Sequence, residues 1–259
     1  MKLTFLGTGT SFGVPQIGCD CDVCTSSDPR DKRTRSGALV ETDTGARILI
    51  DTPPELRLQL IAAHIGRVDA VLLTHEHADH IHGIDDVRAL SVRGGAPLRM
   101  YGPEETLRTL RHRFDYIFDD RMRPLPGTTK PEGELTVLAA GQHVTIAGVD
   151  VIPIAVPHGK TMVFGYRIGA LGYVSVDKLL PPESVDELRG VKVLVINALF
   201  WKSHPTHMSV PEAVEAARAV GAGRTYLTHL THDNRHTDLE AALPPGLLPA
   251  YDGLVVDVD

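Results

Sequence analysis

The residues best suited to chemistry form a short polar string directly after an apolar run. The run AVLL is followed at once by THEHADH. In an extended segment, residues two apart project to the same side, so His75 and His77 can reach one ion. Asp79 and His80 follow where the chain is expected to turn into a helix, and they can face a second ion nearby. Zinc accepts imidazole and carboxylate ligands, and manganese or iron can use them as well. An exposed polar loop would not explain three histidines and an aspartate in six residues.

A second cluster of ligand-type side chains lies near the start of the chain. Cys19, Cys21 and Cys24 fall within six positions, and the chain has no other cysteine. Three close thiols can hold a tetrahedral zinc ion if a fourth ligand comes from elsewhere. The alternative is a set of buried or redox-active thiols without metal, because an odd number of cysteines cannot all pair internally.

Strand-like and helical runs interleave from end to end, and they must position these residues. Expected strands cover residues 2–6, 37–41, 47–50, 70–73, 135–137, 149–155, 163–168, 173–176, 191–196 and 225–227. Expected helices cover residues 55–64, 84–92, 104–113 and a segment that begins at the capping box of Ser209 and ends near Gly221. This pattern predicts one α/β domain over residues 1–259, with no internal repeat or linker.

Composition and charge restrict the classes of partner. The chain of 259 residues has a net charge of −7, whereas surfaces that bind long nucleic acids are normally basic. Bound divalent ions would offset part of this charge and would set the sign of the local field. No apolar stretch approaches the roughly 18 residues that cross a bilayer, and the start does not resemble a signal peptide. We therefore expect a cytoplasmic protein that does not bind membranes.

The string His-x-His-x-Asp-His resembles the signature of the metallo-β-lactamase superfamily. That resemblance implies a four-layer αβ/βα sandwich with two metal ions at one edge. It also implies three further ligands, each following a later strand, and these match His158, Asp177 and His229. The family pattern assigns one metal to His75, His77 and His158, the other to Asp79, His80 and His229, and a bridging position to Asp177.

Asp51 also matches a family position, after the strand predicted over residues 47–50. The resemblance implies that its carboxylate orients a ligand or a loop by hydrogen bonds. The alternative is an ordinary N-cap aspartate ahead of a helix opened by Pro53.

The cysteine cluster narrows the resemblance to one branch of the superfamily. It is similar to the branch that contains the cyclic-phosphate phosphodiesterase of bacterial phosphonate breakdown. There a histidine three positions after the last catalytic one completes a structural zinc site, and His232 stands at that position. The zinc-binding loop would cover residues 7–36. In that branch a histidine at the position of His207 lies beside the metals as a proton donor, whereas His204 is expected to be a surface or supporting residue.

The predicted function is a binuclear metal-dependent hydrolase that acts on small or cyclic phosphodiesters. A hydroxide bridging two zinc or manganese ions, held in part by Asp79 and Asp177, would attack the phosphorus. His207 would protonate the leaving alkoxide. The guanidinium of Arg88 could clamp the phosphate, or it could be a solvated helix arginine. A third ion, the structural zinc, would be held by Cys19, Cys21, Cys24 and His232.

Other activities of the same fold are the alternatives. A lactonase, thioesterase or β-lactamase would not account for the cysteine cluster and His207. A tRNA-processing nuclease would carry a long Gly/Pro-rich arm that grips tRNA, and this sequence shows no obvious equivalent. The basic residues 108–123 could still touch an oligonucleotide. A non-catalytic binding module or a redox protein with bound iron is a third alternative, but redox members of the superfamily usually carry a flavodoxin domain, and this sequence shows none. The sequence departs from the branch pattern at Asn197, at Val176 and at the pair Asp233-Asn234. These departures weaken the inference that this chain acts on the same substrate as the phosphonate enzyme. The oligomeric state, including a homodimer, stays open.

Overall fold

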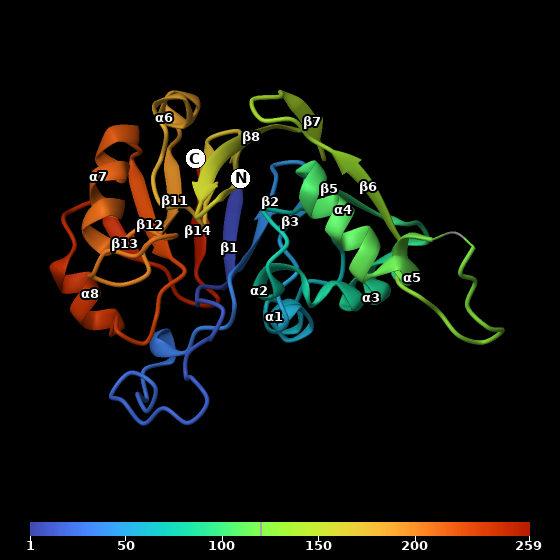
Figure 1. The fold of residues 1–259 in the computed structure, drawn as a ribbon, viewed down its shortest axis with the longest axis horizontal. Helices are drawn as coiled ribbons and strands as arrows, with labels where there is room; N and C mark the ends of the chain where they lie inside the picture. Colours follow the sequence, from blue (N-terminus) through green and yellow to red (C-terminus); the bar gives the residue numbers. More distant parts are fainter. Residues whose placement is uncertain (120) are drawn as a thin grey trace.

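Within the described residues, 1–119 and 121–259 of this computed structural model, two seven-stranded sheets pack face to face (Figure 1). The first sheet has the order β14 (Val255–Asp257), β1 (Lys2–Gly7), β2 (Gly37–Glu41), β3 (Arg47–Ile50), β4 (Ala70–Leu72), β5 (Leu98–Gly102) and β6 (Gly133–Val137). The second has the order β13 (Leu247–Pro249), β12 (Arg224–Thr228), β11 (Val193–Asn197), β10 (Leu171–Val174), β9 (Thr161–Ile168), β8 (Val149–His158) and β7 (Val144–Ile146).

Helices cover the outer face of each sheet. The first sheet carries α1 (Leu56–Ala62), α2 (Ala78–Ile81), α3 (Val87–Gly94), α4 (Glu104–Arg113) and α5 (Asp115–Phe118). The second carries α6 (Pro182–Leu188), α7 (Val210–Val220) and α8 (His236–Ala242). Two short 3-10 helices, η1 (Pro29–Asp31) and η2 (Ile84–Asp86), complete the set. Figure 1 shows the two groups of helices on opposite sides of the sheets.

The alternation of side chains along the strands explains why both faces of each sheet are covered. In β3, Ile48 and Ile50 belong to the core between the sheets, whereas Leu49 belongs to the core under the N-terminal helices. In β11, Val193 and Val195 face the central core, and their neighbours face α6 and α7. Successive strand residues point to opposite faces, so wholly apolar strands are buried on both sides. These four layers confirm the predicted αβ/βα sandwich.

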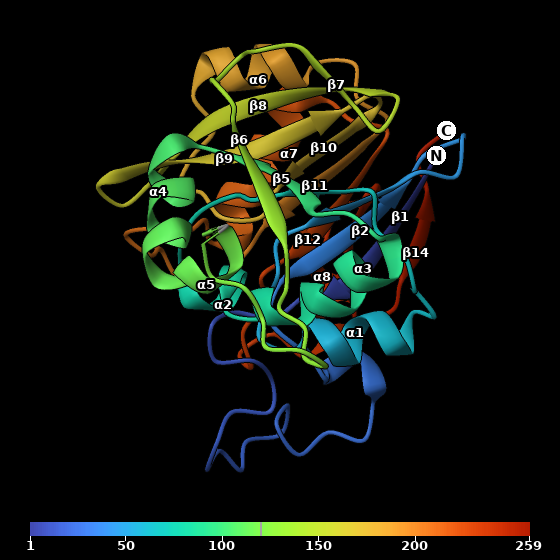
Figure 2. The same cartoon turned by 90° about the vertical axis from the view of Figure 1, so that its right-hand side faces the viewer.

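The residues of chemical interest lie at strand ends along one edge of the molecule. Strands β3 to β6 run parallel, as do β10 to β13. The carboxyl ends of parallel strands meet at a common edge, which here collects the segments after β4, β10 and β12 and the end of β8. The loop between β1 and β2 projects at one end of the molecule in both views (Figures 1 and 2).

Most expected elements are present, with small shifts at their ends. The capped helix is α7: Ser209 accepts from the backbone N–H of Glu212, and Gly221 ends the helix at a φ of 71°. The helix expected over residues 84–92 is instead η2 followed by α3. Strands β5, β7, β13 and β14 and helices α6 and α8 were not predicted; they are short and carry little periodicity. Among the described residues, the helices include none of the length and apolarity needed to span a bilayer.

Candidate metal centre

Two groups of ligand-type side chains face each other at the edge between the sheets. His75 and His77, in the loop after β4, converge with His158, the last residue of β8; one nitrogen from each lies within 4.8 Å of the others. Asp79 and His80, in α2, converge in the same way with His229, which follows β12. We call these the first and second metal groups. Each contains the three residues that the sequence assigned to it.

Asp51 orients both groups through hydrogen bonds. Its Oδ2 accepts from Nδ1 of His80 at 2.7 Å and from the Thr74 hydroxyl at 2.8 Å, and its Oδ1 accepts from the Thr74 backbone N–H at 2.8 Å. The Thr74 oxygen lies 2.9 Å from Nδ1 of His75. Helix α1 begins only at Leu56, so Asp51 is not its N-cap. Of the two roles left open by the sequence, the structure gives Asp51 the orienting one.

These contacts leave the other ring nitrogens available for a metal. Nδ1 of His75 contacts the Thr74 hydroxyl and Nδ1 of His80 contacts Asp51, whereas Nε2 of both rings is buried with no hydrogen-bond partner among the described residues. His158 follows the same pattern, with Nδ1 3.1 Å from the Thr206 carbonyl oxygen. Unpartnered buried nitrogens that converge are costly unless an ion binds them. The donor set therefore fits divalent cations.

The charge state of the side chains suits the same purpose. Burial and the nearby His77 lower the pKa of His158 to about 4, and burial with the nearby His80 holds that of His75 well below its usual range. Both imidazoles are thus neutral near pH 7, which is the form that binds metal. Burial opposes ionisation of Asp79, but the adjacent His80 and His229 hold its pKa well below the ordinary value, so it is a carboxylate.

Asp177 is fully buried after β10, and it belongs to neither three-residue group within the described structure. Its Oδ1 accepts from the amide of Asn197, which also donates to the Asp177 carbonyl at 3.0 Å. No described residue is hydrogen-bonded to Oδ2, and burial raises the pKa of this carboxyl far above its usual range. A nearby cation would offset the cost of that buried charge. The bridging role of Asp177 stays a prediction.

His207 lies against one ligand from each metal group. Its ring is stacked on His229, with centroids 4.7 Å apart, and it meets the ring of His158 edge-on at 4.7 Å. Its Nδ1 is 2.9 Å from the hydroxyl of Thr206, which also lies 3.2 Å from Nδ1 of His204. The sequence did not single out Thr206, because its contacts run through a carbonyl and a hydroxyl that no ligand motif specifies.

The substrate-binding role predicted for Arg88 has no support in the structure. Its guanidinium donates to the carboxylate of Asp85 at 3.0 Å and to the carbonyl of Thr129 at 2.7 Å, on an exposed part of α3. The substrate-binding role of Arg88 stays a prediction, as does the alternative of a solvated helix arginine.

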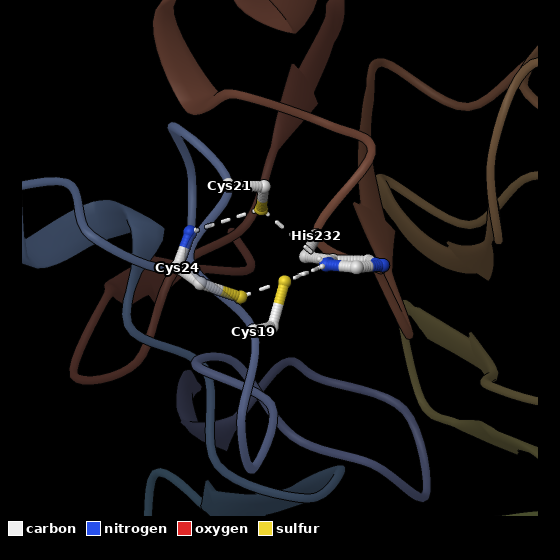
Figure 3. Close-up of side chains that lie close together, drawn as sticks. All are labelled: Cys19, Cys21, Cys24 and His232. Carbon is white, nitrogen blue, oxygen red and sulfur yellow. Dashed lines mark hydrogen bonds between the residues drawn. The ribbon is translucent and has the colours of Figure 1, made fainter.

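The three cysteines of the loop between β1 and β2 converge with His232, which lies in the segment after β12 (Figure 3). Nδ1 of His232 lies 3.3 Å from the sulfur of Cys19, 3.5 Å from that of Cys21 and 3.6 Å from that of Cys24. A hydrogen bond from the Cys24 backbone lowers the pKa of Cys21 to about 6, whereas burial raises that of Cys24 to about 11. Three sulfurs and one imidazole nitrogen match the donor set of a structural zinc site.

We expect Cys21→Ser to lower the melting temperature, because binding energy at a structural zinc site is folding energy. A loss of about 2 kcal/mol would lower the melting temperature of a chain of this size by roughly 4–8 °C. Thermal unfolding with and without a chelator measures the effect, and chelation should lower the wild-type value more than that of the variant. An unchanged melting temperature in Cys21→Ser would show that these thiols hold no stabilising metal.

Comparison with known proteins agrees with this arrangement. The profile of the Beta-lactamase superfamily domain matches residues 46–230. A crystal structure of a diphosphatase from the PhnP family has 41% identity and a TM-score of 0.91, and the match covers 100% of this chain and 98% of that one. The ribonuclease Z of Methanopyrus kandleri is 30% identical over 296 residues, covering 100% of this chain and 98% of its own.

One relative carries the name of a different activity and is about twice as long as this chain. The octanoyltransferase of Porphyromonas gingivalis is 38% identical over 261 residues, but this chain spans only 52% of its length. The profile match, the full-length relatives and the four-layer fold together show that the chain belongs to the metallo-β-lactamase superfamily of metal-dependent hydrolases, and that it resembles the branch containing the PhnP family.

Proposed function

We propose that this protein is a phosphodiesterase with two catalytic divalent ions and one structural zinc. The observation that carries the proposal is the position of His207, an imidazole outside both metal groups that contacts a ligand from each. Hydrolysis of an alkyl phosphodiester needs a proton for the leaving alkoxide, whereas the thiolate of a thioester leaves with less help. The 41% identical diphosphatase supports a phosphate ester or anhydride as the substrate class.

The residues around the site divide the work between holding ions and handling the proton. His75, His77 and His158 would hold one ion, and Asp79, His80 and His229 the other. Once bound, divalent ions lower the pKa of water and polarise a phosphate oxygen. Asp177 would join the two groups, and Asn197 fixes its carboxylate by donating to it. An aspartate in place of Asn197 would put a second negative charge beside Asp177, and the two carboxylates would repel each other unless one of them were protonated.

His207 would act on the leaving group. Burial, together with the neighbouring His229 and His158, holds the pKa of His207 far below its usual range in the free protein. An anionic phosphodiester beside the ring favours the protonated imidazole and raises that pKa. His207 is the proposed proton donor once the substrate is bound, with the Thr206 hydroxyl 2.9 Å from its Nδ1 orienting the ring.

A nuclease acting on RNA ends is the second candidate. The ribonuclease Z relative supports it, as does the segment between α5 and β6, which projects from the molecule (Figure 1) and includes Arg121, Arg123 and Lys130. However, Arg121 is paired with Asp119 at 2.7 Å, and Lys130 donates to backbone carbonyls. The small-substrate proposal is therefore preferred.

The test is a substrate panel run on protein of known metal content. We expect close to three metal ions per chain and hydrolysis of bis-nitrophenyl phosphate, a cyclic ribose phosphate and a diphosphate diester, with little turnover of a lactone or thioester. Removal of metal with a chelator should abolish activity, and zinc or manganese should restore it. Cleavage of an RNA 3′ end faster than any small ester would favour the nuclease. Turnover of the lactone or thioester alone would refute both candidates.

A further inference from the structure

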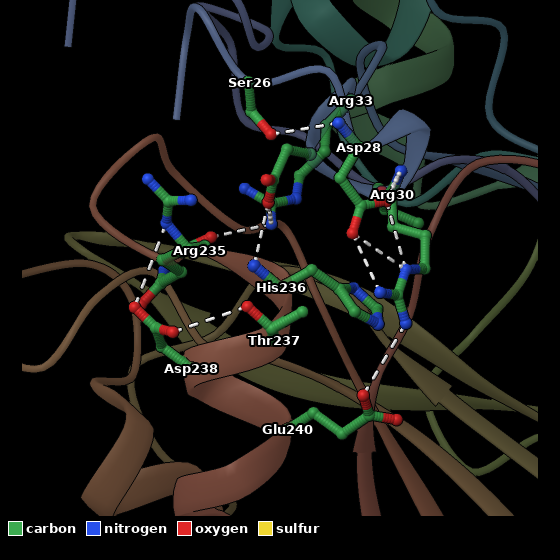
Figure 4. A network of polar contacts seen from close by, with 12 residues as sticks. Ser26, Asp28, Arg30, Arg33, Arg235, His236, Thr237, Asp238 and Glu240 are labelled. Atoms are coloured by element: carbon green, nitrogen blue, oxygen red, sulfur yellow. Dashed lines mark hydrogen bonds and ion pairs between the residues drawn. The ribbon is translucent and has the colours of Figure 1, made fainter. Parts of the chain in front are cut away.

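A buried arginine outside the metal groups joins the cysteine loop to the segment that carries His229 and His232. The side chain of Arg33 has no exposed surface. Its guanidinium donates to the carbonyl of Thr231 at 2.9 Å and to that of Asn234 at 2.7 Å. Figure 4 shows Arg33 within a polar network between the first loop and the start of α8.

Asp31 extends this contact along the same segment. Its Oδ1 lies 3.3 Å from the Arg33 guanidinium and accepts from the backbone N–H of His236 at 2.8 Å. The Arg33–Asp31 pair therefore holds three backbone groups between positions 231 and 236. A planar guanidinium with several fixed donors suits this task, because it can satisfy separate carbonyls at defined positions.

The main chain of Arg33 is itself part of the cysteine loop. Its N–H and C=O pair with Val14 in both directions, each at 2.8 Å. Directly after His229, the N–H of Leu230 donates to the carbonyl of Thr8 at 2.9 Å. The backbone that follows His229 is therefore held from residue 230 to residue 236 by the segment between β1 and β2.

His229 depends on this support more than His75, His80 and His158 do. Nδ1 of His75, of His80 and of His158 has a hydrogen-bond partner, whereas neither ring nitrogen of His229 has one in the described part of the chain. Its φ is +58°, a left-handed conformation that is unfavourable for a non-glycine residue and persists only when the surroundings impose it. The backbone, rather than a ring partner, must therefore set the position of this imidazole.

We propose that Arg33 is a positioning residue for the second metal group. It fixes the segment that follows His229, so that the cysteine site and the catalytic site become coupled through one stretch of chain. Loss of the two hydrogen bonds from the Arg33 guanidinium would weaken metal binding by Asp79, His80 and His229. It would leave metal binding by the first group unaffected. This inference rests on the metal centre in the proposed function but not on the identity of the substrate.

The test is a titration of metal-free protein with Co²⁺, comparing wild type with Arg33→Lys. Lysine keeps the charge beside Asp31, but its single ammonium cannot reproduce the planar fork. Near-ultraviolet charge-transfer absorption from thiolate-bound Co²⁺ reports the cysteine site, and the visible bands that remain after the contribution of that site is subtracted report the two metal groups. The variants His77→Ala and His229→Ala assign the visible bands to the first and second group. We expect Arg33→Lys to lower the Co²⁺ affinity of the second metal group by about 10–100-fold, the usual effect of removing an outer partner of a metal ligand.

The matched control is Arg30→Lys. Arg30 belongs to the same loop and joins Asp28 to Glu240 of α8, but its side chain is one-third exposed, and we expect no change in Co²⁺ affinity. If Arg33→Lys does not fold, Asp31→Asn removes the charge that holds Arg33 while keeping an acceptor for His236, and it should weaken the same group.

Equal weakening of both metal groups, or unchanged affinity at the second, would overturn the inference and leave the proposed function standing. Wild-type protein that binds no Co²⁺ at either group would overturn both.

Discussion

Asp177→Ala is expected to abolish nearly all turnover while the protein stays folded. The carboxylate is completely buried, and its Oδ2 lacks a hydrogen-bond partner in the described structure. If it joins the two metal groups, its removal takes a ligand from both at once. The loss should exceed the roughly 100-fold that removal of an outer partner costs. Turnover of bis-nitrophenyl phosphate and metal content should be measured together.

Asp177→Asn is the matched variant for this prediction. Asparagine keeps the size of the side chain, and its carbonyl oxygen can still accept from Asn197, but the negative charge is lost. We expect the melting temperature of metal-free Asp177→Asn to equal or exceed that of wild type, because burial disfavours the charged form. Activity should nevertheless fall nearly as far as in Asp177→Ala. Full activity in either variant would show that Asp177 has no bridging role.

The ligand groups could be predicted because their information is local. His75, His77, Asp79 and His80 lie in one short string, and the strand before it fixes which way they point. The apolar run of β4 is visible in the sequence, since a strand buried on both faces admits only apolar residues. His158 and His229 came from the resemblance to a family, because single histidines after strands have no distinguishing spacing of their own.

The supporting residues could not be predicted, because their roles depend on atoms that residue types do not specify. Arg33 acts through the carbonyls of Thr231 and Asn234, and any residue at those positions would supply the same oxygen. Thr206 likewise holds His158 through its carbonyl. The role of Asp51 was one of two possibilities until its distance to His80 was known. These supporting roles therefore become visible only when the contacts between distant segments of the chain are known.

His207→Ala is expected to slow hydrolysis of an alkyl or cyclic ribose phosphodiester by about 10²–10⁴-fold, the usual contribution of general acid catalysis. An alkoxide is a poor leaving group and needs a proton as the bond breaks. A nitrophenolate leaves without that help, so bis-nitrophenyl phosphate should lose far less activity. Steady-state rates on both substrates measure the difference.

Metal content provides the control for that comparison. His207 belongs to neither metal group in the described structure, so His207→Ala should retain the wild-type number of ions. Thr206→Val removes the hydroxyl 2.9 Å from Nδ1 of His207 but keeps the carbonyl that holds His158, so it should reproduce part of the leaving-group dependence without loss of metal. Equal losses on both substrates would instead point to positioning or charge stabilisation by His207. Loss of an ion from His207→Ala would mean that this imidazole is itself a ligand, since its ring lies 4.7 Å from both His158 and His229.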